Sequence, residues 1–179
     1  MNKDVKEILL SEEQISEKVK ELGEKITRDY EGMDLLVVVI LKGSVIFASD
    51  LLRQIKKPVE IDFMAVSSYG NGAKTTGVVK IIKDLNDPIE GKNVLIIEDI
   101  LDSGRTLSNL VELLKTRNPN SVEICTLLNK PDRREAEVDT KYSGFDIPDE
   151  FVIGYGLDYA EKYRNLPYIG ILKREVYEK

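Results

Sequence analysis

The sequence predicts an α/β fold in which a mainly parallel, twisted sheet is flanked by helices. Several apolar runs are continuous rather than alternating, as expected of strands that are covered on both faces. Helical patterns separate these runs along the chain, which is typical of βαβ units. The 179 residues contain no repeat, low-complexity tract or long linker, so we expect a single domain.

The first predicted element is a helix. Residues 11–14 read Ser-Glu-Glu-Gln, a capping-box pattern, and the helix is expected to end at Gly32. Residues 35–41 are a continuous run of β-branched residues and leucine, which predicts a central parallel strand, and residues 44–55 predict the next helix. The apolar positions that follow the capping box at helical spacing are Ile15, Val19, Leu22 and Ile26.

The rest of the chain continues the alternation. A strand is predicted over residues 59–66, and the polar, glycine-rich residues 67–77 separate it from the short apolar segment 78–82. Residues 93–98 predict another buried strand, followed by a turn and a helix over residues 105–117. The remaining predicted strands cover residues 121–128 and, in the tail, 151–154 and 169–172.

Composition narrows the classes of function. The formal net charge of −6 argues against a partner that is nucleic acid. The N-terminus lacks the apolar stretch of a signal peptide and the longest apolar run is too short to cross a bilayer, so we expect a cytoplasmic protein without a membrane partner. The single cysteine, Cys125, lies in a strand pattern and is interpreted as an inert core thiol.

The chain contains no histidine. This excludes Ser-His-Asp and Cys-His catalysis and His-ligated zinc. Proton transfer must therefore fall to a carboxylate, Lys, Tyr or solvent, and a metal site must be built from oxygen ligands, which suit Mg²⁺ or Mn²⁺.

The most informative stretch follows the strand predicted over residues 93–98, at the carboxyl end where such sheets bind ligands. The acids Glu98, Asp99 and Asp102 precede Ser-Gly-Arg-Thr at residues 103–106. The turn can present N–H groups and hydroxyls to a phosphate at a helix N-terminus, whereas the acids suit the hydroxyls of a ribose. A sugar phosphate fits both halves. Alternatively, the acids are solvated loop residues and Asp102 is a plain N-cap.

The complete string at residues 98–106 resembles the motif that binds phosphoribosyl pyrophosphate (PRPP) in type I phosphoribosyltransferases of the 6-oxopurine, hypoxanthine-guanine branch. The resemblance covers most of the chain. Residues 41–43 are similar to the pyrophosphate loop of this family, residues 67–70 to its mobile lid, residues 130–131 to its base-recognition lysine, and residues 151–164 to its purine hood. It implies an enzyme of purine salvage that transfers the phosphoribosyl group of PRPP to N9 of hypoxanthine or guanine.

The resemblance also implies roles for individual residues. Glu98 and Asp99 would hold the ribose hydroxyls and, with Asp158, Mg²⁺. Asp102 would be catalytic, as the general base or acid at purine N7. Arg105 occupies a variable position, where it adds a phosphate contact or points to solvent. The residues implied to bind the 5′-phosphate are Asp102, Ser103, Gly104, Arg105 and Thr106.

The leaving group and the base have their own implied residues. Pyrophosphate would be held by Lys42, after a cis Leu41–Lys42 peptide, together with Gly43 and Arg164, and Ser68 and Tyr69 would close over it. Lys130 carries only donors, so it would donate a hydrogen bond to the O6 of a 6-oxopurine and reject the amino group of adenine. Phe151 would stack on the purine, unless it is an ordinary core residue. The other implied purine-binding residues are Val152, Leu157 and Asp158.

Within the single domain over residues 1–179, the resemblance implies a core over about 30–150 and a hood made of the N-terminal segment and about 151–179. It also implies a homodimer or homotetramer. Two alternatives stay open: a phosphoribosyltransferase that prefers xanthine or guanine, and a nucleotide-sensing regulator on the same fold. The acidic charge balance weighs against the regulator.

Overall fold

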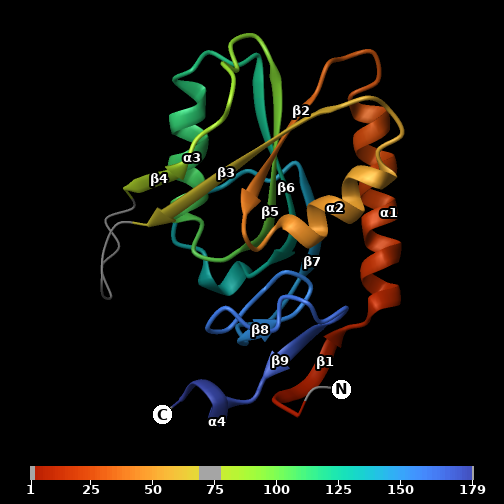
Figure 1. Cartoon of the computed structure of the whole chain (residues 1–179), viewed down its shortest axis with the longest axis vertical. Coiled ribbons are helices and arrows are strands. Elements are labelled where there is room, and N and C mark those ends of the chain that lie inside the picture. Colours follow the sequence, from red (N-terminus) through yellow and green to blue (C-terminus); the bar gives the residue numbers. More distant parts are fainter. Residues whose placement is uncertain (1–2, 69–77, 179) are drawn as a thin grey trace.

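A computed structural model, which describes residues 3–68 and 78–178, shows two separate sheets (Figure 1). The large sheet has the order β4-β3-β2-β5-β6-β7, and only β4 runs antiparallel to its neighbour. The predicted α/β fold with a mainly parallel sheet is therefore confirmed. Its strands are β2 (Leu36–Leu41), β3 (Glu60–Ser68), β4 (Val79–Lys83), β5 (Asn93–Leu101), β6 (Ser121–Asn129) and β7 (Tyr142–Asp146).

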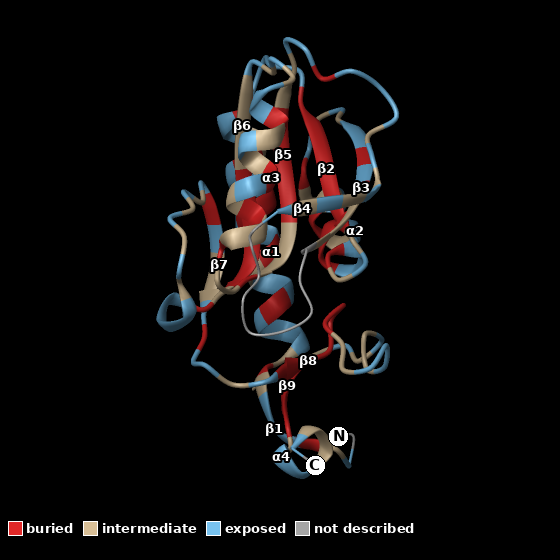
Figure 2. Ribbon diagram, turned by 90° about the vertical axis from the view of Figure 1, so that its left-hand side faces the viewer, coloured by how far each residue is buried: buried red, intermediate tan, exposed pale blue. Residues whose placement is uncertain are grey.

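Helices cover both faces of the large sheet (Figure 2). Side chains of β2 alternate between the two cores, because successive residues of a strand point to opposite faces. Val37 and Val39 pack with helices α1 and α2, whereas Val38 and Ile40 pack with helix α3. The helical elements are α1 (Glu12–Asp29), α2 (Val45–Gln54), α3 (Arg105–Lys115), the 3-10 helix η1 (Pro131–Arg133) and α4 (Arg174–Tyr177). None of the helices in the described ranges combines the length and apolar character that a membrane span needs.

Helix α1 begins as predicted and ends earlier than predicted. The Oγ of Ser11 accepts a hydrogen bond from the N–H of Gln14 at 3.2 Å, and the Oε1 of Gln14 accepts one from the N–H of Ser11 at 2.9 Å. The helix stops at Asp29 rather than at Gly32. Gly32 has a φ of +73° and lies in the turn that leads to β2.

The small sheet joins the two ends of the chain. It consists of β1 (Val5–Leu10), β9 (Ile169–Leu172) and β8 (Val152–Ile153), and both neighbouring pairs are antiparallel. Both termini lie at this end of the molecule, beyond the carboxyl ends of the parallel strands (Figure 1). We call β1 together with residues 151–178 the hood. Helix α1, which lies in the N-terminal segment, packs instead against the large sheet.

Two strands were not predicted from the sequence. β1 carries three charged or exposed positions in a row and is ordered by its pairing with β9, about 160 residues away. β7 contains Gly144, where a Cβ would overlap the carbonyl oxygen of Leu127 on the adjacent strand β6. Both strands depend on distant partners, which local patterns do not reveal. β5 also extends to Leu101, beyond its predicted end at Glu98, so Asp99 lies on the strand as well and not in the following loop.

Candidate active site

A cavity of about 450 Å³ lies where the ends of β5 and β6 meet the hood. It gathers side chains that are far apart in the sequence, including Asp102 and all the residues predicted to bind the purine. This convergence is the main reason to regard the cavity as a base-binding site. The cavity is lined by Ile100, Asp102, Lys130, Arg133, Asp149, Glu150, Phe151, Val152, Leu157, Asp158 and Tyr177.

Lys130 reaches the cavity from the end of β6. Its side chain is buried, and its backbone N–H donates to the carbonyl oxygen of Leu101 at 2.9 Å, which locks the ends of β6 and β5 together. Its Nζ lies 3.8 Å from the Oδ1 of Asp149. A buried ammonium group is stable only with partners, so Lys130 is suited to receive an acceptor from a bound base.

Phe151 is not an ordinary core residue. Its side chain is 37% exposed and lines the cavity. The ring of Tyr177 stacks against it at 4.9 Å between centroids, and Tyr159 meets it edge-on at 5.6 Å. Two tyrosines therefore hold the ring in place, one of them from helix α4 at the end of the chain.

The acids of β5 form a compact, partly buried pair. The Oγ of Ser44 donates to the Oε1 of Glu98 at 3.0 Å, and the N–H of Ile100 donates to the Oδ1 of Asp99 at 2.7 Å. Burial and the neighbouring charge of Asp99 raise the pKa of Glu98 well above its usual value. Burial also raises the pKa of Asp99, against the opposing hydrogen bonds and the charge of Arg164. A bound cation or a set of hydroxyl donors would relieve this crowding of negative charge.

The backbone of the predicted pyrophosphate loop lies directly against these acids. The Leu41–Lys42 peptide is cis. A Cβ on Gly43 would overlap the Asp99 carboxylate, and a Cβ on Gly156 of the hood would overlap the carbonyl oxygen of Gly43. The loop, the end of β5 and the hood therefore meet where only glycine fits.

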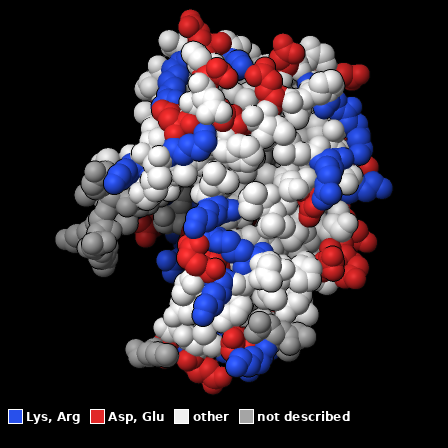
Figure 3. Space-filling model, in the orientation of Figure 1, with Lys and Arg blue, Asp and Glu red and all other residues white. Residues whose placement is uncertain are grey.

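The two predicted pyrophosphate cations are engaged with acids of the hood. The exposed Lys42 forms an ion pair with Glu161 at 2.8 Å. The guanidinium of Arg164 donates to the carbonyl oxygen of Gly156 at 2.7 Å and lies 3.0 Å from the Oδ1 of Asp158. Its Nε is buried and has no hydrogen-bond partner among the described residues. Both cations lie on the hood side of the pyrophosphate loop, and basic side chains gather on this face between the sheet and the hood (Figure 3).

The predicted metal ligands do not come together as one cluster. Within residues 3–68 and 78–178, no group of three or more acids is arranged to hold a metal ion. Asp158 is paired with Arg164, while Glu98 and Asp99 lie together at the end of β5. Two adjacent carboxylates still suit Mg²⁺, which proteins often bind through one or two carboxylates plus substrate oxygens and water.

The predicted phosphate loop leads into helix α3. Gly104 has a φ of +81° at the helix N-cap, and the Oγ of Ser103 accepts a long bond of 3.4 Å from the N–H of Arg105. The side chain of Arg105 pairs with Glu135 at 2.5 Å, on the segment that follows η1. Thr106 lies in the first turn of the helix. Tyr69 and the side chain of Ser68, predicted for the lid, lie outside the part of the chain that the structure describes.

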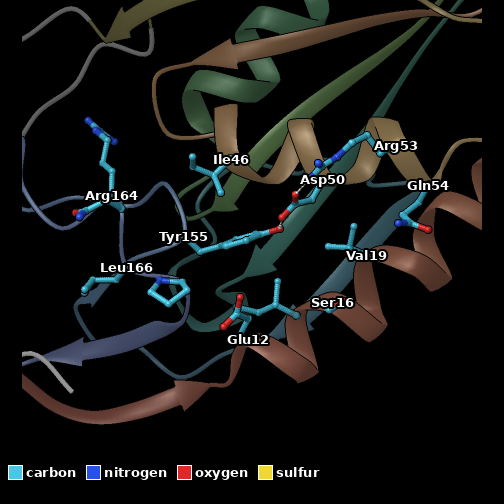
Figure 4. A pocket seen from close by; sticks show the side chains of 13 residues that line it. Glu12, Ser16, Val19, Ile46, Asp50, Arg53, Gln54, Tyr155, Arg164 and Leu166 are labelled. Carbon is cyan, nitrogen blue, oxygen red and sulfur yellow. Dashed lines mark hydrogen bonds and ion pairs between the residues drawn. The ribbon is translucent and has the colours of Figure 1, made fainter.

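A second cavity of about 550 Å³ lies between α1, α2 and the hood (Figure 4). Of the predicted site residues, it includes only Arg164. In this cavity the hydroxyl of Tyr155 donates to the Oδ2 of Asp50 at 2.5 Å, and Arg53 pairs with the same aspartate. Burial and this bond raise the pKa of Tyr155. The bond ties the hood to α2.

The sequence analysis missed five residues that line the first cavity, and three of them, Arg133, Asp149 and Tyr177, contact predicted site residues. Arg133 donates through its Nε to the Oδ1 of Asp102 at 2.9 Å. Asp149 lies between Arg133 and Lys130, and Tyr177 covers Phe151. Arg133 could have been suspected because it follows Lys130 within one turn, but Asp149 and Tyr177 carry no local signal.

Comparisons with known proteins show the family to which the chain belongs. Residues 6–160 match the family described as phosphoribosyl transferase domain. A hypoxanthine-guanine phosphoribosyltransferase from Staphylococcus aureus is 59% identical over 177 residues, 99% of each chain. The bifunctional protein TilS/HprT of Listeria monocytogenes is 56% identical over all 179 residues, but this chain spans only 28% of its length.

Solved structures give the same result. A crystal structure of a hypoxanthine phosphoribosyltransferase from S. aureus has a TM-score of 0.96 at 59% identity, covering 98% of this chain and 96% of that one. A hypoxanthine-guanine phosphoribosyltransferase from Bacillus anthracis, with a HEPES molecule in its active site, has a TM-score of 0.91 at 53% identity, covering 94% and 99% of the two chains.

Proposed function

The chain belongs to the phosphoribosyl transferase domain family and is a transferase, and we propose that it joins hypoxanthine or guanine to the ribose 5-phosphate of PRPP. The observation that carries this proposal is the first cavity. It sets a buried ammonium, a carboxylate and an exposed aromatic ring around one space, beside a phosphate-type turn at the start of α3. A flat base with an acceptor and a removable proton fits that set.

The site would recognise the base through the pattern of its hydrogen-bond donors and acceptors and through the shape of its ring. Lys130 donates to the O6 acceptor of hypoxanthine or guanine, while Phe151 and Leu157 lie against the purine plane and Val152 contributes its backbone. Adenine carries an amino donor at that position. Two donors would then face each other without an acceptor in a buried site, so adenine is rejected.

The reaction would proceed by substitution at C1 of the ribose. The N9 lone pair of the base forms the new bond, the bond from C1 to the pyrophosphate oxygen breaks, and Asp102 accepts the proton that leaves N7. A carboxylate is a suitable acceptor in a chain without histidine. The Ser-Gly-Arg-Thr turn at residues 103–106 would hold the 5′-phosphate with backbone N–H groups.

Pyrophosphate would leave from the space between the loop at Lys42 and Gly43 and the hood. Arg164 carries a buried Nε that can donate to it. Glu98 and Asp99 would hold the ribose hydroxyls and Mg²⁺, which supplies positive charge to the leaving group when bound. The family resemblance assigns Ser68 and Tyr69 to a lid that would exclude water, and Tyr69 and the side chain of Ser68 lie outside the described residues.

A spectrophotometric assay tests the proposal. With PRPP and Mg²⁺, we expect turnover of hypoxanthine and guanine and no turnover of adenine or uracil. Asp102→Asn keeps the shape of the side chain but cannot accept a proton, so kcat should fall about 10²- to 10⁴-fold. Turnover of xanthine or guanine alone would point to a sibling specificity. Binding of nucleotide without turnover of any base would overturn the enzymatic proposal and favour a regulator.

We also propose that the chain acts in the cytoplasm as a homodimer or homotetramer. An uncovered part of the large sheet supports self-association. Ile61 and Phe63 of β3 pair in register with Val37 and Val39 of β2, on the face that α1 and α2 cover at β2, yet they are 48% and 37% exposed. Ile82 on the neighbouring β4 is 67% exposed. The mass of the particle in solution, measured by sedimentation, tests this.

A further inference from the structure

Arg133 gives the catalytic carboxylate a partner that the proposed mechanism does not yet use. Its Nε donates to the Oδ1 of Asp102 at 2.9 Å, inside the cavity proposed to bind the base. Both side chains are about half exposed, so the pair would contribute little to the free energy of unfolding. Its position suggests a role in the reaction instead, because a carboxylate that accepts a proton must be held in one orientation.

The backbone fixes this pair relative to the lysine that reads the base. Lys130 donates its N–H to the carbonyl oxygen of Leu101, the residue directly before Asp102, at 2.9 Å. Arg133 in turn donates its N–H to the carbonyl oxygen of Lys130 at 3.2 Å, closing the 3-10 turn η1. One short turn therefore carries both the Lys130 ammonium, which is proposed to donate to O6 of the base, and the Arg133 guanidinium, which contacts Asp102.

Asp149 completes a chain of alternating charges across the cavity. Its Oδ1 lies 3.7 Å from the Nη1 of Arg133 and 3.8 Å from the Nζ of Lys130. The order is Lys130, Asp149, Arg133 and Asp102, and all four line the same cavity. Each cation thus lies near an acid, which limits how far either can swing away.

We propose that Arg133 is a positioning residue: it holds the Asp102 carboxylate in the orientation that accepts the purine proton. Asp149, which lies between Arg133 and Lys130, links this residue to the lysine that contacts the base. The Arg133 bond engages one carboxylate oxygen, so the other can receive the proton. This rests on the proposed function, because it needs a purine in the cavity.

A double-mutant cycle tests the inference. Arg133→Ala should lower kcat/KM for hypoxanthine about tenfold, as expected for a lost hydrogen bond to a charged group. In an Asp102→Asn background, Arg133→Ala should lower kcat/KM for hypoxanthine less than about twofold, because the carboxylate that Arg133 positions is already absent. The KM for PRPP and the melting temperature should stay unchanged in both backgrounds.

Two further variants sharpen the test. Arg133→Lys keeps the charge and one donor, so it should recover most of the lost activity. Asp132→Asn changes an exposed neighbour on the same turn and serves as the matched control with wild-type activity.

Two outcomes would overturn the inference: an Arg133→Ala variant as active as wild type, or an equal loss in the Asp102→Asn background. Either result in an enzyme that still converts hypoxanthine leaves the proposed function intact. If the wild-type chain converts no 6-oxopurine, the proposed function itself fails.

Discussion

The two sides of the site are built by different means. On the sheet side, Glu98 lies on β5 and Asp102 directly follows it, and the apolar residues 94–97 of this strand are fully buried between two paired neighbours. On the hood side, β8 has two residues, and the segment after it bends through a series of left-handed conformations. The residues with positive φ in this segment are Gly154, Tyr155, Gly156, Ala160, Glu161 and Tyr163.

This difference teaches where the site is robust and where it is vulnerable. The large sheet rests on many interchangeable apolar contacts, so one substitution there changes its shape little. Buried apolar residues of the hood, among them Val152, Leu157 and Ile169, belong to the main core cluster. The close polar and backbone contacts between the hood and the rest of the chain are specific, and they include Tyr155 with Asp50, Gly156 with Gly43, and Glu161 with Lys42. Single changes in the hood should therefore disturb catalysis more than they disturb the fold of the core.

The largest effect is expected where the hood touches the pyrophosphate loop. Gly156→Ala would force a side chain onto the carbonyl oxygen of Gly43 at a φ of +101°. The strained backbone conformation should lower the free energy of unfolding by about 1–2 kcal/mol, and the overlap should lower it by about 1–3 kcal/mol more. Because displaced groups cannot align the substrates, kcat/KM for hypoxanthine should fall about 10²-fold. Steady-state assays and thermal melts measure both effects.

Gly32→Ala is the matched control. Gly32 has a φ of +73°, but a Cβ there would meet nothing within 4 Å. In this variant the free energy of unfolding should fall only by the cost of the backbone conformation, about 1–2 kcal/mol, and activity should stay at the wild-type level. Equal losses of activity in the two variants would show that strain alone, and not the contact between hood and loop, governs the site.

A smaller effect is expected at the outer edge of the hood. Tyr177→Ala removes the ring that stacks on Phe151 at 4.9 Å. An aromatic pair contributes about 0.5–1.5 kcal/mol beyond its burial, so the KM for hypoxanthine should rise about two- to tenfold. The KM for PRPP should not change, because Tyr177 lines the base cavity.

Tyr177→Phe keeps the ring and should keep the wild-type KM for both substrates. A lower KM for hypoxanthine in Tyr177→Ala would contradict the expectation. It would mean that Tyr177 competes with the base for the face of Phe151 rather than supporting that ring.

The smallest effect is expected deep in the core. The hydroxyl of Tyr30 is buried without a hydrogen-bond partner among the described residues. Tyr30→Phe should therefore leave activity unchanged and raise the free energy of unfolding at neutral pH by up to about 1 kcal/mol. A loss of activity would show that the core tolerates changes less well than its many apolar contacts suggest.

The same variant should alter stability in alkali. Burial, with help from Glu123 and Asp29, raises the pKa of Tyr30 from 10.0 to about 12. The folded state therefore keeps this proton when the unfolded state has lost it, so stability is fully present below pH 10 and falls as the pH rises toward 12. Denaturant titrations from pH 8 to 11 should show a shallower decline in Tyr30→Phe than in wild type.

Local patterns predicted the sheet side well. Continuous apolar runs identified β2, β5 and β6, and the capping box at Ser11 marked the start of α1. Such signals are local because a central strand must be apolar along its whole length and a helix must satisfy its own first N–H groups. β1 and β7 were missed because each is ordered by a strand distant in sequence or by a backbone contact at a glycine.

The residues of the site likewise fall into those that local sequence patterns predicted and those that they did not. The string at residues 98–106 predicted a sugar-phosphate site because its acids and its turn are adjacent in the chain. Asp149 and Tyr177 gave no such signal, and Arg133 gave only its closeness to Lys130 in the chain, since all three contact site residues that are distant in sequence. The predicted metal ligands also separated, because Asp158 pairs with Arg164 of the hood.

The sequence by itself determined the fold class, the strand that ends in acids and the exclusion of histidine chemistry, since each follows from residue types at short spacing. The tertiary structure decided which side chains share the cavity, which cation holds Asp102 and where only glycine fits. The physical reason is that packing brings together residues that lie far apart in the chain. A contact between distant residues leaves no periodic trace in either segment.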